Sequence, residues 1–308
     1  MYELAILARG GVLLTVRAVA AGWPPGRLAG RLHRDGWQRI CRGAWAAPGK
    51  EVDWRVRATA HQLLRPDLVC SHGTAARLHR IEQLHGDNPP DLLHFTTRPP
   101  ARSAHHPRSR IRIHTTTHLT DHDRTTRRGL RTTTPARTVG DLIRRSRSRE
   151  EAVVIADSAL AHRAVDGIRR APLVDYEDLA TELATPRPGS ARARTWLPWA
   201  EPASGSPAET VARLRIRDAG LLPESQPTLL TPAGLPLHPD FLFRAAGLAV
   251  EIEGYAFHGT RRSHERDITR FNALQTCPTI RRVLRFTATE VFTRPDRMTA
   301  TILAALSL

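Results

Sequence analysis

Three carboxylic acids in the last third of the chain have the types and spacing of a cation-binding site. Residues 237–243 and 248–253 read as two strands joined by a short turn, and an antiparallel hairpin there places Asp240 opposite Glu251. Glu253 shares the face of Glu251, because side chains alternate along a strand. Like charges opposed across paired strands are destabilising by roughly several tenths of a kcal/mol. A hard divalent cation such as Mg²⁺ relieves this repulsion and can activate water against a phosphodiester.

The opposite face of the same hairpin is expected to be apolar. The register that pairs the acids also places Phe241 beside Val250 and Phe243 beside Leu248. These four side chains form one surface that is suited to packing under a helix. One face of the hairpin is therefore predicted to pack in the core, and the other to carry the acidic residues.

Helices and strands alternate around this hairpin from residue 206 to the end of the chain. The pattern predicts a helix at 207–219, a strand at 226–230, the two hairpin strands, a helix at 264–275, a strand at 281–286 and a helix from Pro295. The order α-β-β-β-α-β-α indicates a mixed α/β domain.

Two short motifs in this region resemble those of the PD-(D/E)xK nuclease superfamily. Pro239-Asp240-Phe241 stands where the family has its PD, and Glu251-Ile252-Glu253-Gly254 stands where it has (D/E)xK followed by glycine. Residues 206–308 are similar to the very-short-patch-repair-like endonuclease domain of that superfamily, which implies a restriction-endonuclease-like αβββαβ fold. The resemblance also implies that Asp240, Glu251 and Glu209, the last on the preceding helix, ligate Mg²⁺ or Mn²⁺.

The resemblance extends to the residues that would handle the attacking water, with one departure. His258 matches the family's downstream histidine, and the segment from Asp267 matches its D-x-x-R-x-x-x-L, in which Arg270 is the arginine. Histidine is a suitable general base because its ordinary pKa is about 6.5. Glu253 replaces the motif lysine, so either Glu253 and His258 tune or deprotonate the water, or the fold is retained for binding alone. Arg270 is expected either to contact phosphate or to pair with Asp267 or Glu251.

The first fifty residues read as three short helices followed by a small hairpin. Helices are expected near 4–8, at 15–21 with Thr15 as the cap, and at 26–35 after Pro24-Pro25, and strands at 37–41 and 44–47. This order is typical of a winged helix-turn-helix, whose third helix enters the major groove of DNA while the wing contacts the backbone.

Several arginines of this segment are predicted to hold DNA through its phosphates. Leu28 and Leu32 mark the buried side of the third helix. The exposed side and the hairpin turn carry Arg27, Arg31, Arg34 and Arg42. The alternative is a small protein-interaction module in which these arginines are simply solvated.

Residues 1–50 resemble the N-terminal domain of AbiEi-type antitoxins of abortive-infection systems. The stretches 69–79 (VCSHGTAARLH) and 133–142 (TTPARTVGDL) are similar to segments of actinobacterial proteins of that architecture. The resemblance implies a DNA-binding autoregulator in phage defence, with a cognate toxin protein as a second partner.

The middle of the chain carries no recognisable metal, nucleophile or nucleotide motif. Ser71-His72 lacks the GxSxG surroundings of a nucleophile and is interpreted as a helix start. Six histidines between His94 and His122 stand among threonines and arginines and form no i, i+4 pair on an expected helix, so they predict a solvated basic strand region and not a metal site. Gly49-Lys50 lacks the spacing of a phosphate loop, and no nucleotide cofactor is expected.

The composition favours a polyanionic partner. The 308 residues include 46 Lys and Arg against 30 Asp and Glu, a formal net charge of +16. The excess is concentrated early, with 8 basic and 2 acidic residues at 1–50, 25 and 17 at 51–200, and 13 and 11 at 201–308. DNA is therefore the first partner to consider.

Compartment and domain boundaries follow from what the chain contains. No apolar run approaches the ~18 residues that span a bilayer, and the three cysteines stand far apart, so a cytoplasmic protein with no membrane contact is expected. Residues 198–207 are rich in Pro, Gly and Ser and are interpreted as a linker. Three domains are predicted: a winged helix at 1–50, a mixed α/β middle domain at 51–200, and an endonuclease-like domain at 206–308.

Two functions from different classes follow. The first is Mg²⁺-dependent hydrolysis of phosphodiester bonds in DNA, with RNA as a weaker alternative substrate. The second is a non-catalytic antitoxin or transcriptional autoregulator that keeps an inactive nuclease fold.

Overall fold

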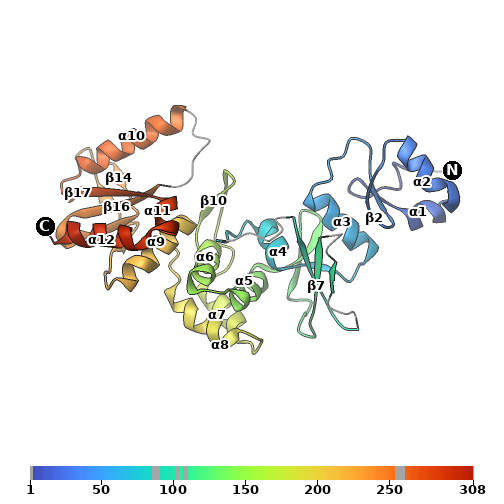
Figure 1. Cartoon of the computed structure of the whole chain (residues 1–308), viewed down its shortest axis with the longest axis horizontal. Coiled ribbons are helices and arrows are strands. Elements are labelled where there is room, and N and C mark those ends of the chain that lie inside the picture. The colour runs from blue at the N-terminus through green and yellow to red at the C-terminus, as the bar shows by residue number, and fades with distance from the viewer. Residues whose placement is uncertain (1–2, 85–90, 101–103, 107–109, 254–260, 308) are drawn as a thin grey trace. The chain divides into compact units, whose positions relative to one another are not determined.

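The protein has a mixed α/β architecture with several separate sheets (Figure 1). The computed structural model describes residues 3–84, 91–100, 104–106, 110–253 and 261–307. The chain forms two compact units: the N-terminal unit is Met1–Arg80 with Gly86–Asp141, and the C-terminal unit is Ile81–His85 with Leu142–Leu308. The α/β multidomain class is confirmed, and the predicted middle domain is divided between the two units. Every helix among the described residues is too short or too polar to cross a bilayer.

The N-terminal segment has two helices and a three-stranded antiparallel sheet. Its elements are β1 (Val12–Leu14), α1 (Thr15–Ala20), α2 (Pro25–Arg34), β2 (Gln38–Cys41) and β3 (Ala44–Ala46), and the strand order is β1-β3-β2. Pro25 opens α2 as expected, and its Leu28 and Leu32 are fully buried.

Two local predictions for this segment are wrong. Residues 4–7 form turns in place of a first helix, and the unpredicted strand β1 pairs with β3. Thr15 does not cap α1, because it is the first residue of the helix and Leu14 is at the N-cap position. Its hydroxyl instead accepts a hydrogen bond from the indole Nε1 of Trp45 at 3.2 Å. Both differences involve β3: it pairs with β1, and its Trp45 contacts Thr15. These partners are thirty or more residues apart in the chain, so a local pattern does not reveal them.

The rest of the N-terminal unit is built on a six-stranded mixed sheet of order β6-β7-β5-β4-β9-β8. Its elements are α3 (Trp54–Leu64), β4 (Val69–Cys70), α4 (His72–His79), β5 (Leu93–Thr97), β6 (Ala104–His106), β7 (Ile111–Thr115), β8 (Arg124–Arg127) and β9 (Leu130–Thr133). Strand β5 lies in parallel with β7, and its buried Leu93 and Phe95 belong to the core. The interpretation of Ser71-His72 as a helix start is confirmed, since Ser71 is the N-cap residue of α4.

A helical region follows the large sheet. It contains α5 (Pro135–Arg145), α6 (Arg149–Leu160), the strand pair β10 (Arg163–Val165) and β11 (Ile168–Arg170), α7 (Tyr176–Ala184) and α8 (Ser190–Trp196). The passage interpreted as a linker is packed within the C-terminal unit: Ser204 is buried and its hydroxyl accepts a hydrogen bond from the Arg213 guanidinium. Its breaker residues therefore form a packed turn region between α8 and α9.

The last hundred residues contain helices and strands as predicted, but the described residues form ten α-helices and strands where seven were expected. The elements are α9 (Pro207–Asp218), β12 (Glu224–Ser225), β13 (Leu229–Leu230), β14 (Pro236–Leu237), β15 (Phe241–Phe243), β16 (Leu248–Glu253), α10 (Arg261–Gln275), β17 (Arg282–Thr287), α11 (Ala288–Thr293) and α12 (Pro295–Leu306). The main sheet has the order β12-β15-β16-β17, and β16 runs parallel to β17. The predicted register of the hairpin is confirmed, with Phe241 opposite Val250 and Phe243 opposite Leu248.

Helices cover both faces of this sheet (Figure 1). Helices α9, α11 and α12 pack on the face that carries Phe241 and Val250. The face predicted to be acidic is acidic only at one end, because Leu242 and Ala249 lie on it and pack with Leu274 of α10. The acids are therefore confined to the end of the hairpin where Asp240 enters β15.

Candidate functional site

Asp240 lies directly before β15, where its carboxylate is held by the neighbouring strand. Its Oδ2 accepts a hydrogen bond from the backbone N–H of Ile252 at 2.7 Å. Its Oδ1 accepts a hydrogen bond from the side-chain amide of Gln226 at 2.8 Å. The residue is only 7% exposed, so the carboxyl group is desolvated and its orientation is determined by these two donors.

Glu209 reaches the same place from the first turn of α9. Ser206 begins this helix by accepting a hydrogen bond from the backbone N–H of Glu209. The Glu209 carboxylate accepts one hydrogen bond from the backbone N–H of Gly205 at 2.6 Å and one from the Gln226 amide at 3.0 Å. A Cβ on residue 205 would lie 3.1 Å from both Glu209 oxygens, so glycine there allows the backbone to approach the carboxylate.

Gln226 joins the two carboxylates, a role that no sequence pattern predicts. Its side-chain nitrogen donates to both Glu209 and Asp240. Its backbone has a φ of +46°, in the left-handed region that non-glycine residues seldom adopt. Gln226 was expected to begin a strand, but it follows β12, and this backbone conformation turns its amide between the two acids.

Glu251 is the third acid at this end of the sheet. It is buried on β16, and its Oε2 forms an ion pair with the guanidinium of Arg270 at 2.7 Å. Arg270 also donates a hydrogen bond to the backbone oxygen of His238 at 2.7 Å. Of the alternatives for Arg270, pairing with Glu251 is the one observed.

The gathering of acids perturbs their protonation. Burial, followed by the charges of Glu209 and Glu251, raises the pKa of Asp240 from 3.8 to about 7. Burial also raises the pKa of Glu251, and the positive charge of Arg270 opposes that shift. Groups with strongly shifted pKa values that are held together at one place are typical of functional sites.

The remaining predicted residues of this site are not part of the buried group. Glu253 is exposed and forms an ion pair with Arg285, whose guanidinium also lies over the ring of Phe271. His258 lies outside the described residues, as does the side chain of Asp267. The arrangement therefore joins Glu209, Asp240 and Glu251, while Glu253 faces solvent.

The predicted DNA-contacting arginines of the N-terminal unit are exposed. Arg27, Arg31 and Arg34 project from α2, and Arg42 lies in the turn between β2 and β3. Arg31 forms an ion pair with Asp35 at 2.6 Å, so part of its positive charge is balanced by a neighbouring carboxylate.

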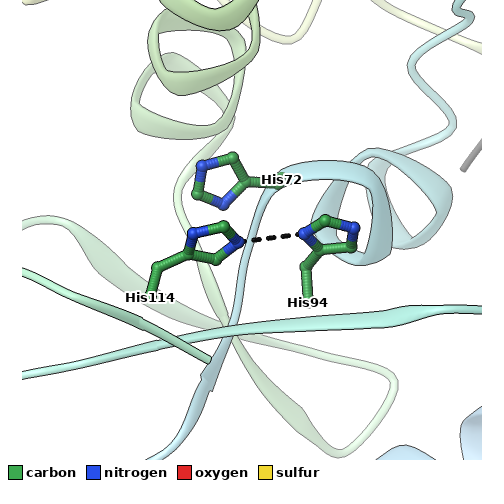
Figure 2. A group of neighbouring side chains, drawn as sticks. All are labelled: His72, His94 and His114. Carbon is green, nitrogen blue, oxygen red and sulfur yellow. Dashed lines mark hydrogen bonds between the residues drawn. The ribbon is translucent and has the colours of Figure 1, made fainter. Parts of the chain in front are cut away.

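A cluster of histidines in the N-terminal unit corrects another prediction. His94 is buried on β5, and it lies with His114 of β7 and His72 of α4 (Figure 2). The histidines between His94 and His122 are therefore not all solvated. No local spacing reveals this cluster, because its members meet only through the parallel pairing of β5 with β7 and the start of α4.

Comparisons with known proteins do not assign a family. No protein-family model matches the chain, and no curated protein matches it. A solved structure, the RV2827C protein from Mycobacterium tuberculosis, aligns with a TM-score of 0.43 and 17% identity over 74% of this chain and 87% of that one.

Proposed function

We propose that the protein binds DNA and hydrolyses its phosphodiester bonds with the help of Mg²⁺ or Mn²⁺. One observation carries the proposal: Asp240 is buried together with Glu209 and Glu251, so that its pKa is raised to about 7. A protein that gathers carboxylates in this way raises its own free energy unless a proton or a cation compensates. A bound divalent cation would offset the repulsion between these carboxylates and would also give them a catalytic role.

The order of elements in the C-terminal region supports this proposal. Helix α9 leads into the antiparallel strands β12, β15 and β16, and α10 then connects β16 to the parallel strand β17. This is the αβββαβ order of the PD-(D/E)xK endonucleases, which the sequence motifs resemble. In the same way, the order β1, α1, α2, β2, β3 supports a winged helix, in which α2 would be the recognition helix.

The donor chemistry of the three acids fits a hard divalent ion. Asp240, Glu209 and Glu251 would hold the ion through carboxylate oxygens, which Mg²⁺ prefers. When bound, the ion supplies a Lewis acid that polarises the phosphodiester and lowers the pKa of a coordinated water. Gln226 keeps Glu209 and Asp240 oriented toward each other, and Arg270 is placed to exchange its contact with Glu251 for one with phosphate.

The N-terminal arginines would supply affinity without base specificity. Arg27, Arg31 and Arg34 of α2 and Arg42 of the β2–β3 turn are exposed, as phosphate contacts require. Such contacts make the affinity fall steeply as the salt concentration rises, because each contact releases counterions from DNA.

Plasmid cleavage in the presence of Mg²⁺ or Mn²⁺ tests the hydrolase proposal. We expect the wild-type protein to nick supercoiled DNA, and Asp240→Ala and Glu209→Gln to lose the activity. Glu224→Gln is a matched control in the same sheet, since Glu224 is exposed and pairs with Arg244. Absence of nicking by the wild-type protein, with Asp240→Ala behaving identically, would falsify the proposal; single-stranded RNA in parallel reactions tests the alternative substrate.

One observation favours a second, non-catalytic function. Two of the acids are already neutralised by arginines of the chain itself, Glu251 by Arg270 and Glu253 by Arg285. Glu253 also stands where the nuclease motif has its lysine. A domain without that lysine can bind a partner without cleaving it. The alternative proposal is therefore an AbiEi-like antitoxin or autoregulator in phage defence that binds DNA and a cognate toxin, and it predicts DNA binding without nicking.

A further inference from the structure

The histidine cluster brings three imidazoles together from three separate elements. His114 of β7 lies opposite Thr96 of β5, and His94 lies two residues before Thr96 on the same face of the sheet. His72 is the first residue of α4 and is joined to the sheet next to His94, because the backbone N–H of Ser71 donates to the backbone oxygen of His94 at 3.0 Å. Figure 2 shows the three rings next to one another, with the His72 ring stacked on that of His114 and a hydrogen bond between His114 and His94.

The spacing of the ring nitrogens is that of a ligand set. One candidate ligand nitrogen from each of the three residues lies within 4.8 Å of the other two. Nδ1 of His94 and Nε2 of His114 are 3.0 Å apart. Two imidazoles bound at 2.0–2.1 Å to a tetrahedral Zn²⁺ have their nitrogens roughly 3.3 Å apart, so His94 and His114 need to separate only slightly to admit the ion. The ring of His72, which is stacked on that of His114, has to rotate so that its nitrogen faces the same point.

The second ring nitrogen of His72 has the kind of neighbour that orients a metal-bound histidine. Its Nδ1 lies 3.0 Å from Ser71 Oγ, and Ser71 Oγ also accepts a hydrogen bond from Thr96 Oγ1 at 2.8 Å. With Nδ1 donating to Ser71, the lone pair of His72 is on Nε2. Histidine ligands in metal sites regularly donate their second ring nitrogen to such a neighbour, which fixes the tautomer.

The backbone of His72 is itself unusual. Its φ of +47° lies in the left-handed region, which is strained for a residue with a Cβ. The chain maintains this conformation at a residue that is only 9% exposed. The strained residue is the one that closes the cluster.

An anion site does not explain the geometry equally well. The 3.0 Å contact between His94 and His114 requires one of the two nitrogens to be without a proton, so both rings cannot be imidazolium in this arrangement. The ring centroids of His72 and His114 are only 4.0 Å apart, which two positive rings would oppose. Neutral imidazoles in close contact are the form that ligates metal ions.

We propose that His72, His94 and His114 form a binding site for a first-row transition-metal ion of the Zn²⁺ class. Three nitrogen ligands leave a fourth tetrahedral position for water, as in catalytic zinc sites. Imidazole nitrogens suit Zn²⁺, Ni²⁺ or Cu²⁺, whereas Mg²⁺ prefers oxygen ligands. The site is therefore independent of the carboxylates around Asp240 and of the hydrolase proposal.

Metal analysis after equilibrium dialysis against Zn²⁺ tests the site in the full-length protein. We expect the wild-type protein to retain one equivalent of Zn²⁺ in the presence of excess Mg²⁺, and His114→Gln to lose it. His122→Gln is the matched control, since His122 is exposed and belongs to the same unit, and it retains the equivalent. Asp240→Ala also retains it, which separates this test from the proposed nuclease.

A second variant keeps the test decisive if His114→Gln fails to fold by circular dichroism. Ser71→Ala leaves all three ligands in place but removes the orienting contact to His72, and we expect Zn²⁺ affinity to fall about 10–100-fold. Replacement of Zn²⁺ by Co²⁺ is expected to produce visible absorption that a nitrogen-ligated tetrahedral site gives. The proposal is overturned if the wild-type protein holds no stoichiometric Zn²⁺, if Mg²⁺ displaces it, or if a folded His114→Gln and Ser71→Ala bind as well as the wild type.

Discussion

Among the residues of the acidic site, Asp240 has the pKa that is raised most clearly by burial and neighbouring charges. Its folded-state pKa of about 7 lies above the ordinary value of 3.8, so the folded protein binds this proton more tightly than the unfolded chain. The resulting stabilisation is complete below about pH 4 and is lost as the pH rises through 7. At about 1.4 kcal/mol per pH unit the total is on the order of 4 kcal/mol.

Replacement of this carboxyl group by an amide tests the shift directly. We expect the free energy of unfolding of the metal-free wild-type protein to fall between pH 5 and pH 8, and the fall to be much smaller in Asp240→Asn. The measurement is denaturant unfolding at several pH values, with Glu224→Gln as the control because Glu224 is exposed. An equal pH dependence in wild type and Asp240→Asn would show that Asp240 titrates as an ordinary exposed carboxyl.

The residues of the acidic site divide into those that sequence predicts and those that it does not. Asp240 and Glu251 were predicted because strand alternation and one short turn determine which side chains share a face. Gln226 was missed, since its role depends on a positive φ and on Glu209, which approaches from another element. The cluster around His94 was missed for a related reason: its members come from segments about twenty residues apart in the chain.

At the scale of elements, an ion pair inside the C-terminal unit positions the helix that carries Glu209. Asp157 of α6 and Arg213 of α9 form an ion pair of 2.8 Å, and both side chains are almost fully buried. The Asp157 carboxylate also accepts a hydrogen bond from Thr210 of α9. Burial raises the pKa of Asp157 to about 6, although the charge of Arg213 opposes the shift. Two consecutive turns of α9 are thus joined to α6 through one carboxylate.

Removal of the cation from this pair should destabilise the protein strongly. We expect Arg213→Leu to lower the free energy of unfolding by about 3–5 kcal/mol near pH 8, because it leaves a buried carboxylate without its partner. The loss is expected to be smaller at pH 5, where Asp157 takes up a proton and no unpaired charge remains. Denaturant unfolding at the two pH values measures the difference.

The same sheet-and-helix region contains a matched exposed pair. Arg244 and Glu224 form an ion pair of 2.6 Å with both side chains about half exposed. We expect Arg244→Leu to lower the free energy of unfolding far less than Arg213→Leu does, since solvent screens exposed pairs. If Arg213→Leu is no more destabilising than Arg244→Leu, or if its effect is the same at pH 5 and pH 8, burial of the Asp157 pair does not have the energetic role assigned to it.

Elements with a complete local signal were predicted well. Helix α2 has a proline at its start and buried leucines four residues apart, α9 has a serine cap, and β16 has alternating apolar residues. Only the last two residues of the strand expected at 226–230 form a strand, β13, while β12 ends before it at Ser225 and belongs to a different sheet. Helix α11 was missed because it is only six residues long and follows β17 directly. Such short elements are stabilised mainly by their contacts with distant parts of the chain, and a local sequence pattern carries no information on those contacts.

Over the whole molecule, most of the net charge and the acidic site around Asp240 are carried by different units. The N-terminal unit holds 23 basic and 10 acidic side chains, and the C-terminal unit holds 23 and 20. Most of the net charge of +16 therefore belongs to the N-terminal unit, whereas the acidic site around Asp240 belongs to the C-terminal unit. Attraction of a polyanion and chemistry on it should thus be separable by mutation.

The separation can be measured through the salt dependence of DNA binding. Each phosphate contact contributes about 0.9 to the slope of log affinity against log salt concentration, so Arg27→Gln, Arg31→Gln and Arg34→Gln together should reduce the slope by about 2–3. Asp240→Asn should leave the slope unchanged, and the triple variant should retain the pH dependence of unfolding that Asp240 causes. Arg169→Gln is a control for loss of an exposed arginine from the C-terminal unit. If the triple variant has the salt slope of the wild type, α2 is not part of the DNA interface, because three phosphate contacts cannot be lost without a change in counterion release.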